Sequence, residues 1–86
     1  MGALQTYGKQ YQANQDYASL KQVVDKLPEG ATKKDIISIL GEPIDMGFDL
    51  RYLLDSTGQN GCVVGAVFHY DEKGVIDQKW LDEICE

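Results

Sequence analysis

The chain has 86 residues, of which 26% are charged and 43% hydrophobic, and its formal net charge is -6. This length allows one domain with a small core, and no apolar run approaches the roughly 18–20 residues of a membrane-spanning helix. The acidic balance argues against nucleic-acid binding and against unaided adsorption to anionic lipid, because both need a basic surface. One His and two Cys are too few for a tetrahedral zinc site without carboxylates.

The first residues show no secretory signal. Met1-Gly2 is followed by a short polar stretch with neither a charged start nor an apolar segment. Met-Gly is a common cloning remnant, and removal of a natural N-terminal segment explains this start equally well. From its length we treat residues 1–86 as one domain. We expect residues 1–10 to fray, because they follow the helical pattern only loosely.

Two helices are predicted in the first half of the chain. Residues 5–27 contain no Pro and are rich in helix-compatible side chains. Thr32 is a good N-cap for a second, short helix, with Asp35 at its N3 position. Gly41 ends that helix, and Pro43 prevents it from resuming. The apolar positions at helical spacing are Tyr17, Leu20, Val24 and Leu27 in the first helix, and Ile36, Ile37, Ile39 and Leu40 in the second.

Three strands are predicted in the second half. Residues 48–55 alternate between apolar and mostly polar side chains, residues 62–70 form a second strand, and residues 75–81 form a third. Residues 71–74 make a hairpin connection, with Gly74 at the position that needs positive φ. The predicted fold is α+β, with two N-terminal helices packed on one face of a three-stranded antiparallel meander.

The register of the last two strands follows from burial. A three-residue loop, residues 72–74, pairs Asp71 with Val75 and keeps the apolar partners on one face, whereas a slip of one residue moves every side chain to the other face. The predicted pairs are Tyr70 with Ile76, His69 with Asp77, Phe68 with Gln78, and Ala66 with Trp80.

The two cysteines allow two interpretations. In this register Cys62 lies opposite Ile84, so Cys85 is one residue away, and a turn after the third strand brings the two sulfur atoms together. A disulfide then closes the loop, provided that the compartment is oxidising. In a reducing cytosol the same residues remain two unpaired thiols.

The residues indicate no catalytic site, cofactor or metal centre. His69 opposite Asp77 is either an oriented general base or an exposed cross-strand pair, and no nucleophile motif accompanies it. The acidic residues near the end of the chain match no calcium loop and suit a solvated terminus. We therefore expect a non-enzymatic protein.

A partner-binding surface is predicted on the sheet face that the helices leave open. Leu53, Val67 and Leu81 point away from the predicted helix layer. The alternative is a mixed face exposed to solvent or covered by the N-terminal segment. The candidate partner-binding residues are Met46, Phe48, Arg51, Leu53, Val67 and His69.

Residues 27–43 read L-P-E-G-A-T-K-K-D-I-I-S-I-L-G-E-P. This segment resembles the SmpA/OmlA (BamE-like) small lipoproteins, whose domains read roughly G-x-T-x-x-x-V-x-x-x-L-G-x-P. Arg51-Tyr52 and residues 67–75 are similar to the family's first strand and hairpin, so the resemblance covers about residues 27–80. The sequence lacks a lipobox and the usual Trp of the first strand, and its cysteines are outside the pattern. The positions that match are Gly30, Thr32, Ile36 (for Val), Leu40, Gly41 and Pro43.

This resemblance implies a two-helix, three-strand domain similar to half of a beta-lactamase-inhibitor-like repeat. It also implies a periplasmic or envelope location, protein partners and no catalysis, with a lipid anchor only where a lipobox has been removed. The best-known family member is an accessory subunit of the outer-membrane β-barrel assembly machine. An inhibitor or immunity-type protein that blocks a target enzyme is the alternative, because the same fold family hosts inhibitors and the net charge of -6 favours a basic cleft.

Overall fold

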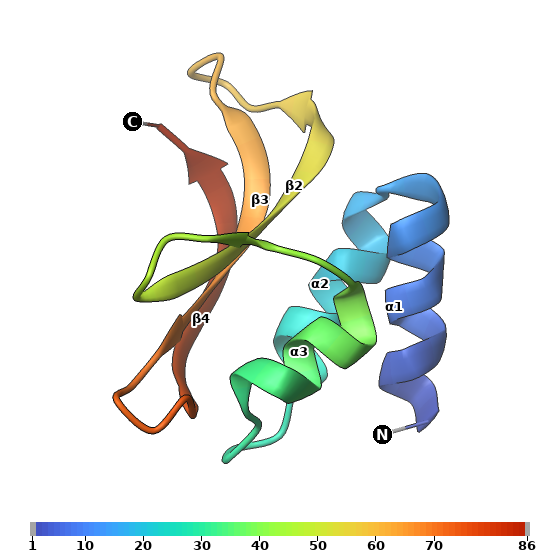
Figure 1. Cartoon of the computed structure of the whole chain (residues 1–86). Helices are drawn as coiled ribbons and strands as arrows, with labels where there is room; N and C mark the ends of the chain where they lie inside the picture. Colours follow the sequence, from blue (N-terminus) through green and yellow to red (C-terminus); the bar gives the residue numbers. More distant parts are fainter. Residues whose placement is uncertain (1, 86) are drawn as a thin grey trace.

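Helices cover one face of a four-stranded antiparallel sheet in the computed structural model, which describes residues 2–85 (Figure 1). The α+β class is as expected, but this part of the chain contains three helices and four strands where two and three were predicted. The strand order is β1-β2-β3-β4. The elements are α1 (Gly2–Asn14), α2 (Tyr17–Lys26), α3 (Lys33–Leu40), β1 (Ile44–Asp45), β2 (Asp49–Thr57), β3 (Val63–Tyr70) and β4 (Ile76–Ile84).

The single helix predicted over residues 5–27 is wrong, because the chain breaks between α1 and α2. Gln15 has a positive φ of 50°, which ends α1. Asp16 then caps α2, since its carboxylate accepts a hydrogen bond from the backbone N–H of Ser19 at 3.0 Å. The break lets α1 and α2 fold back on each other, as Figure 1 shows. A polar Asn-Gln-Asp stretch, residues 14–16, was the sequence signal for this turn.

The short helix α3 is confirmed together with its caps. Thr32 and Asp35 form a reciprocal capping box, with each side chain accepting from the backbone N–H of the other residue. Gly41 follows the helix with φ 86°, a conformation that glycine adopts without a Cβ clash. This helix is therefore defined almost entirely by local chemistry.

Residues 2–10, where fraying was expected, lie in α1 and contribute to the core. Leu4 and Tyr11 of α1 are buried. Gly8 faces α3 so closely that a Cβ atom added there would stand 1.9 Å from the backbone oxygen of Ile39. The absence of a side chain at Gly8 is what allows α1 and α3 to approach.

We expect Gly8→Ala to destabilise the protein by about 1–3 kcal/mol, the usual cost of forcing an extra carbon into a packed interior. Helix propensity alone predicts the opposite sign, a gain of about 1 kcal/mol, because alanine is the better helix former. We expect the steric clash to outweigh the gain in helix propensity, since the obstructing atom belongs to the backbone and cannot rotate away. Urea unfolding followed by circular dichroism measures the change. A variant as stable as the wild type would contradict this packing of α1.

Strand β1 was not predicted. It has two residues, and Ile44 pairs with Arg51 of β2. Asp45 anchors it, because its carboxylate lies 2.8 Å from the Lys33 ammonium and accepts hydrogen bonds from the Gly47 backbone and the Tyr70 hydroxyl. The Lys33 ammonium, followed by those two donors, lowers the pKa of Asp45 to about 2. The edge strand is thus held to α3 and β3 by one carboxylate.

The predicted β3–β4 register is correct only next to the hairpin. Tyr70 pairs with Ile76 as expected, but His69 pairs with Gln78 instead of Asp77. Asp77 is the extra residue of a β-bulge. Beyond the bulge every β4 side chain is shifted by one position, so Phe68 lies opposite Lys79.

The shift decides which β4 side chains face the helices. Trp80 pairs with Val67 rather than Ala66, so it lies on the sheet face away from the helices. Leu81 pairs with Ala66 and packs against the core, which corrects the prediction that it points outward. Lys79 also points inward, and its ammonium donates hydrogen bonds to the backbone oxygens of Val24 and Leu27 at the end of α2. The bulge thus lets a lysine of β4 donate to backbone oxygens at the C-terminal end of α2.

The core lies between the helices and the inner face of the sheet. Tyr52 packs edge-on against both Tyr11 and Phe68, with ring centroids about 6 Å apart. Burial raises the pKa of both tyrosines, and each hydroxyl donates to a backbone oxygen, that of Leu53 for Tyr11 and that of Gly41 for Tyr52. The largest fully buried side chains are Phe68, Leu20, Ile36, Ile39, Leu50 and Val23.

Candidate functional site

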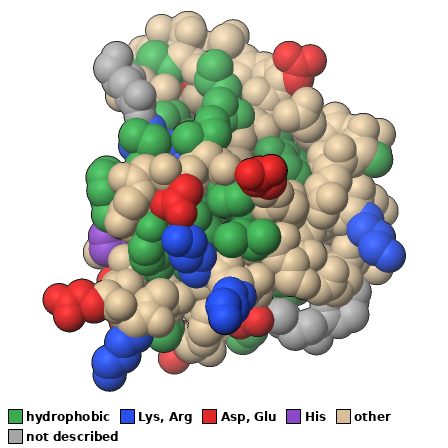
Figure 2. Space-filling view, in the orientation of Figure 1, with side chains coloured by type: hydrophobic (Ala, Val, Ile, Leu, Met, Phe, Trp, Pro, Cys, Tyr) green, Lys and Arg blue, Asp and Glu red, His purple; other side chains and the backbone are tan. Residues whose placement is uncertain are grey.

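The sheet face away from the helices, called the outer face below, carries several solvent-exposed apolar side chains. Ile44, Val63 and Trp80 are between 38% and 48% exposed. Figure 2 shows hydrophobic side chains gathered on the strand-bearing side of the molecule. From the strand register, the outer face consists of Ile44, Asp49, Arg51, Leu53, Val63, Gly65, Val67, His69, Gln78, Trp80, Asp82 and Ile84.

One cavity of about 230 Å³ opens on this face. The sheet supplies most of its wall, and Met46, which follows β1 and is 41% exposed, completes it. Its lining is apolar apart from one guanidinium, so it suits an aliphatic or aromatic side chain of a partner. The cavity is lined by Ile44, Met46, Arg51, Leu53, Val63 and Ile84.

A larger hollow of about 490 Å³ lies beside the first, between the end of α1 and strands β1 and β2. Ile44, Arg51 and Leu53 line both. The helix side adds polar groups, including the side chains of Gln12 and Gln15. The two hollows make a continuous surface that passes from apolar to polar across β1 and β2.

The outer face defined above carries two carboxylates, Asp49 and Asp82, and one guanidinium, Arg51. Asp49 is buried, and its carboxylate lies 3.4 Å from Arg51, so these two charges offset each other. Asp82 is exposed beside Gly65, and Asp77 stands at the bulge. No lysine belongs to the outer face as defined above, because Lys79 of β4 points to the helices. Asp82 is therefore the exposed carboxylate that a Lys or Arg group of a partner would meet on the same face as the apolar cavity.

Most of the predicted partner-binding residues come together on this face. Met46, Arg51 and Leu53 line the same cavity. Val67 lies on the outer face as predicted, but it is only 3% exposed, between Arg51 and Trp80 in the register. The neighbouring strands therefore leave Val67 little surface that a partner could contact.

Phe48 and His69 lie outside the cavity. Phe48 is 53% exposed in the connection between β1 and β2, and His69 is on the outer face near the hairpin. His69 Nδ1 lies 2.6 Å from the Asp77 carboxylate, so the pair expected from sequence forms even though the register differs. No serine or cysteine side chain is hydrogen-bonded to His69 within residues 2–85. As an exposed cross-strand pair it contributes a few tenths of a kcal/mol.

Four large apolar residues of this face were missed: Ile44, Val63, Trp80 and Ile84. Trp80 was assigned to the core because the bulge was not foreseen. Ile44 belongs to a strand that was not predicted. Val63 was within reach of sequence reasoning, since period-two alternation places it on the face of Val67 and His69.

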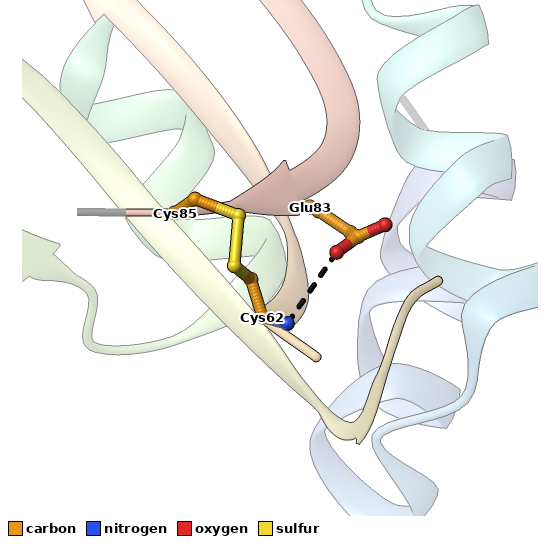
Figure 3. A group of neighbouring side chains, drawn as sticks. All are labelled: Cys62, Glu83 and Cys85. Atoms are coloured by element: carbon orange, nitrogen blue, oxygen red, sulfur yellow. Dashed lines mark hydrogen bonds between the residues drawn. A yellow bond between two sulfur atoms is a disulfide. The ribbon is translucent and has the colours of Figure 1, made fainter. Parts of the chain in front are cut away.

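A disulfide joins Cys62 to Cys85, which matches the first of the two interpretations drawn from sequence (Figure 3). It connects the residue before β3 to the residue after β4, beside Val63 and Ile84 of the cavity. The carboxylate of Glu83 accepts hydrogen bonds from the backbone N–H groups of Asn60 and Cys62. The disulfide and the Glu83 hydrogen bonds therefore connect the end of β4 to the loop that precedes β3.

None of the helices described over residues 2–85 combines the length and the apolar character needed to cross a membrane. We also compared the chain with known proteins. No family model, curated protein or solved structure matches it.

Proposed function

We propose that the protein is a non-enzymatic interaction domain of the bacterial cell envelope, which binds a protein partner through the outer face of its sheet. The observation that carries the proposal is the apolar cavity, lined in part by exposed Ile44 and Met46, on the sheet side that the helices leave open. Exposed Trp80 lies on the same side of the sheet. An exposed apolar group of this kind is typical of a protein-binding surface. Met and Trp are also enriched in such surfaces.

The chemistry of the face indicates the kind of partner segment. An apolar side chain of the partner fills the cavity, and a Lys or Arg group of the partner meets the exposed Asp82 on the same face. Trp80 adds a flat ring over which a guanidinium can stack. The net charge of -6 favours the approach of such a basic partner.

Two features support the envelope location. The Cys62–Cys85 disulfide is of the kind that persists in oxidising compartments. The segment from Gly30 to Pro43, which forms α3 and its caps, carries the resemblance to the SmpA/OmlA (BamE-like) lipoproteins. On the basis of that resemblance we propose that the protein is an accessory to outer-membrane assembly. We also propose that its fold is related to beta-lactamase-inhibitor-like domains.

Affinity capture from a native envelope extract, with cross-linking and mass identification, tests this function. Trp80→Ala should weaken capture of the envelope partner by about thirtyfold, the loss typical of an aromatic hot spot. Tyr17→Ala is the matched control, because Tyr17 is an aromatic residue of similar exposure, 51% against 43%, on α2 in the helix layer. Equal loss in both variants, or in neither, would contradict binding through the outer face.

The second candidate is an inhibitor or immunity-type protein, which the acidic balance also suits. The same experiment separates the two functions. Recovery of one soluble enzyme in near-equal amount, without envelope proteins, would favour the inhibitor. Binding of that enzyme should then fall steeply with added salt, because it depends on opposite net charges.

A further inference from the structure

We propose that reduction of the Cys62–Cys85 disulfide converts this end of the sheet into a site for one thiophilic divalent cation, with Zn²⁺ as the best fit and Glu83 as the third ligand. This inference is separate from the proposed function. It concerns the ends of β3 and β4 and does not depend on a partner.

The geometry carries the proposal. The two sulfur atoms and a carboxylate oxygen of Glu83 all lie within 4.8 Å of one another. The register explains why, because Val63 pairs with Ile84 and so places Cys62 and Cys85 at adjoining strand ends, with Cα atoms 5.3 Å apart. Figure 3 shows the Glu83 side chain turned toward Cys62 from the neighbouring strand. Three donor atoms are therefore already gathered.

Glu83 is held in position by the loop that it contacts. Its carboxylate accepts from the Asn60 N–H at 3.1 Å and from the Cys62 N–H at 3.4 Å. A Cβ added at Gly58 would stand 2.2 Å from the Glu83 carboxyl carbon, so the loop closes tightly around this side chain. Since a carboxylate has about four acceptor sites, Glu83 can keep these hydrogen bonds while one oxygen binds a cation.

The chemistry balances as two steps. A dithiol reductant supplies two electrons and two protons, so the S–S bond of the protein breaks and the reductant becomes a cyclic disulfide. The cation then displaces the two thiol protons and binds both thiolates. Two sulfurs, one carboxylate oxygen and a water complete the four-coordinate geometry that Zn²⁺ prefers, with one position open to exchange. Soft thiolates exclude Ca²⁺ and Mg²⁺ from such a site.

The site is open to both reactants. Cys85 is exposed and Cys62 is half-buried, so a small dithiol and a hydrated cation can reach the sulfur atoms. A dication bound by ligands from both strand ends holds those ends together in the reduced protein.

Cobalt titration tests the proposal. The protein is reduced with dithiothreitol, freed of reductant without oxygen, and titrated with Co²⁺ while the thiolate-to-cobalt charge-transfer absorption is recorded. We expect one Co²⁺ per chain, displacement by Zn²⁺, and no such absorption from the oxidised protein. Cys85→Ser should abolish it. Glu83→Gln should weaken binding about tenfold or more, a loss of the size seen when groups around a metal are removed.

Glu72→Gln is the matched control, because it removes the same charge from an exposed position in the β3–β4 hairpin, at the opposite end of these strands. It should leave cobalt affinity unchanged. Thermal melting gives an independent readout, since Zn²⁺ should raise the melting temperature of the reduced wild type and leave that of Cys85→Ser unchanged. No absorption in the reduced protein, one metal per two chains, or equal affinity in Glu83→Gln and Glu72→Gln would overturn the proposed site.

Discussion

Replacement of Phe68 by alanine is expected to lower the free energy of unfolding by about 3–5 kcal/mol. Phe68 of β3 is fully buried, and its ring packs edge-on against Tyr52. The variant loses the transfer free energy of the ring and leaves a cavity that the sheet cannot close. A domain of this size has about 4–13 kcal/mol of total stability, so the change removes a large share of it.

Urea unfolding followed by circular dichroism measures the effect of Phe68→Ala. His69→Ala is the matched control, because it alters the next residue of the same strand on the outer face, where only the exposed pair with Asp77 is lost. We expect this control to change stability by less than about 1 kcal/mol. Similar losses in both variants would mean that the inner face of the sheet is not the core side.

Loss of the Cys62–Cys85 disulfide is expected to lower the free energy of unfolding by roughly 3 kcal/mol. The bridge has a sequence separation of 23 residues and encloses β3, the hairpin and β4. Most of the effect comes from the unfolded chain, whose conformational freedom the bridge restricts. The native fold should survive, because neither cysteine belongs to the buried core.

Three variants test this effect: Cys62→Ser, Cys85→Ser and the double variant. Because either single change removes the whole bridge, all three should lose the same stability, as should the wild type after reduction in the absence of metal. Losses that add in the double variant would show that each cysteine contributes by packing instead. The midpoint of urea unfolding should move by about 1–3 M in each case.

The outer face gains its binding character from residues that are distant in sequence. Ile44 follows α3, Met46 lies in the turn into β2, Leu53 is in the middle of β2, and Trp80 lies in the last strand. Each is unremarkable by itself, since single exposed apolar side chains are common. Only their position on one side of the sheet, where Ile44, Met46 and Leu53 line a cavity and Trp80 lies on the same face, supports a function.

Local chemistry in the sequence was enough to predict several elements. The Thr32–Asp35 capping box and Gly41 bound α3 as expected, and Gly74 has the positive φ that its hairpin requires. These signals act over a few residues, where steric limits and single hydrogen bonds outweigh packing. Helices followed by antiparallel strands likewise indicated the α+β class.

Longer-range features were decided by packing. The break at Gln15 is stable because α1 can then lie against α3, with Gly8 at the contact. Strand β1 exists because Asp45 finds partners from α3 and β3. A window of neighbouring residues contains no information about such partners, so the sequence pattern predicted one long helix and omitted this strand.

In the candidate site, the register of β4 was likewise predicted in part from the sequence and decided in part by packing. The residues 71–74 hairpin and the start of the ladder followed from the sequence, whereas the bulge at Asp77 did not. Two registers that differ by one residue both place apolar side chains against the core, and the difference depends on distant contacts, such as Lys79 with the end of α2. By itself the sequence determined the fold class, the caps and the closeness of the two cysteines. The tertiary structure decided which side of β4 faces the helices, and thereby placed Trp80 on the outer face, because strand register depends on what each side chain meets across the sheet.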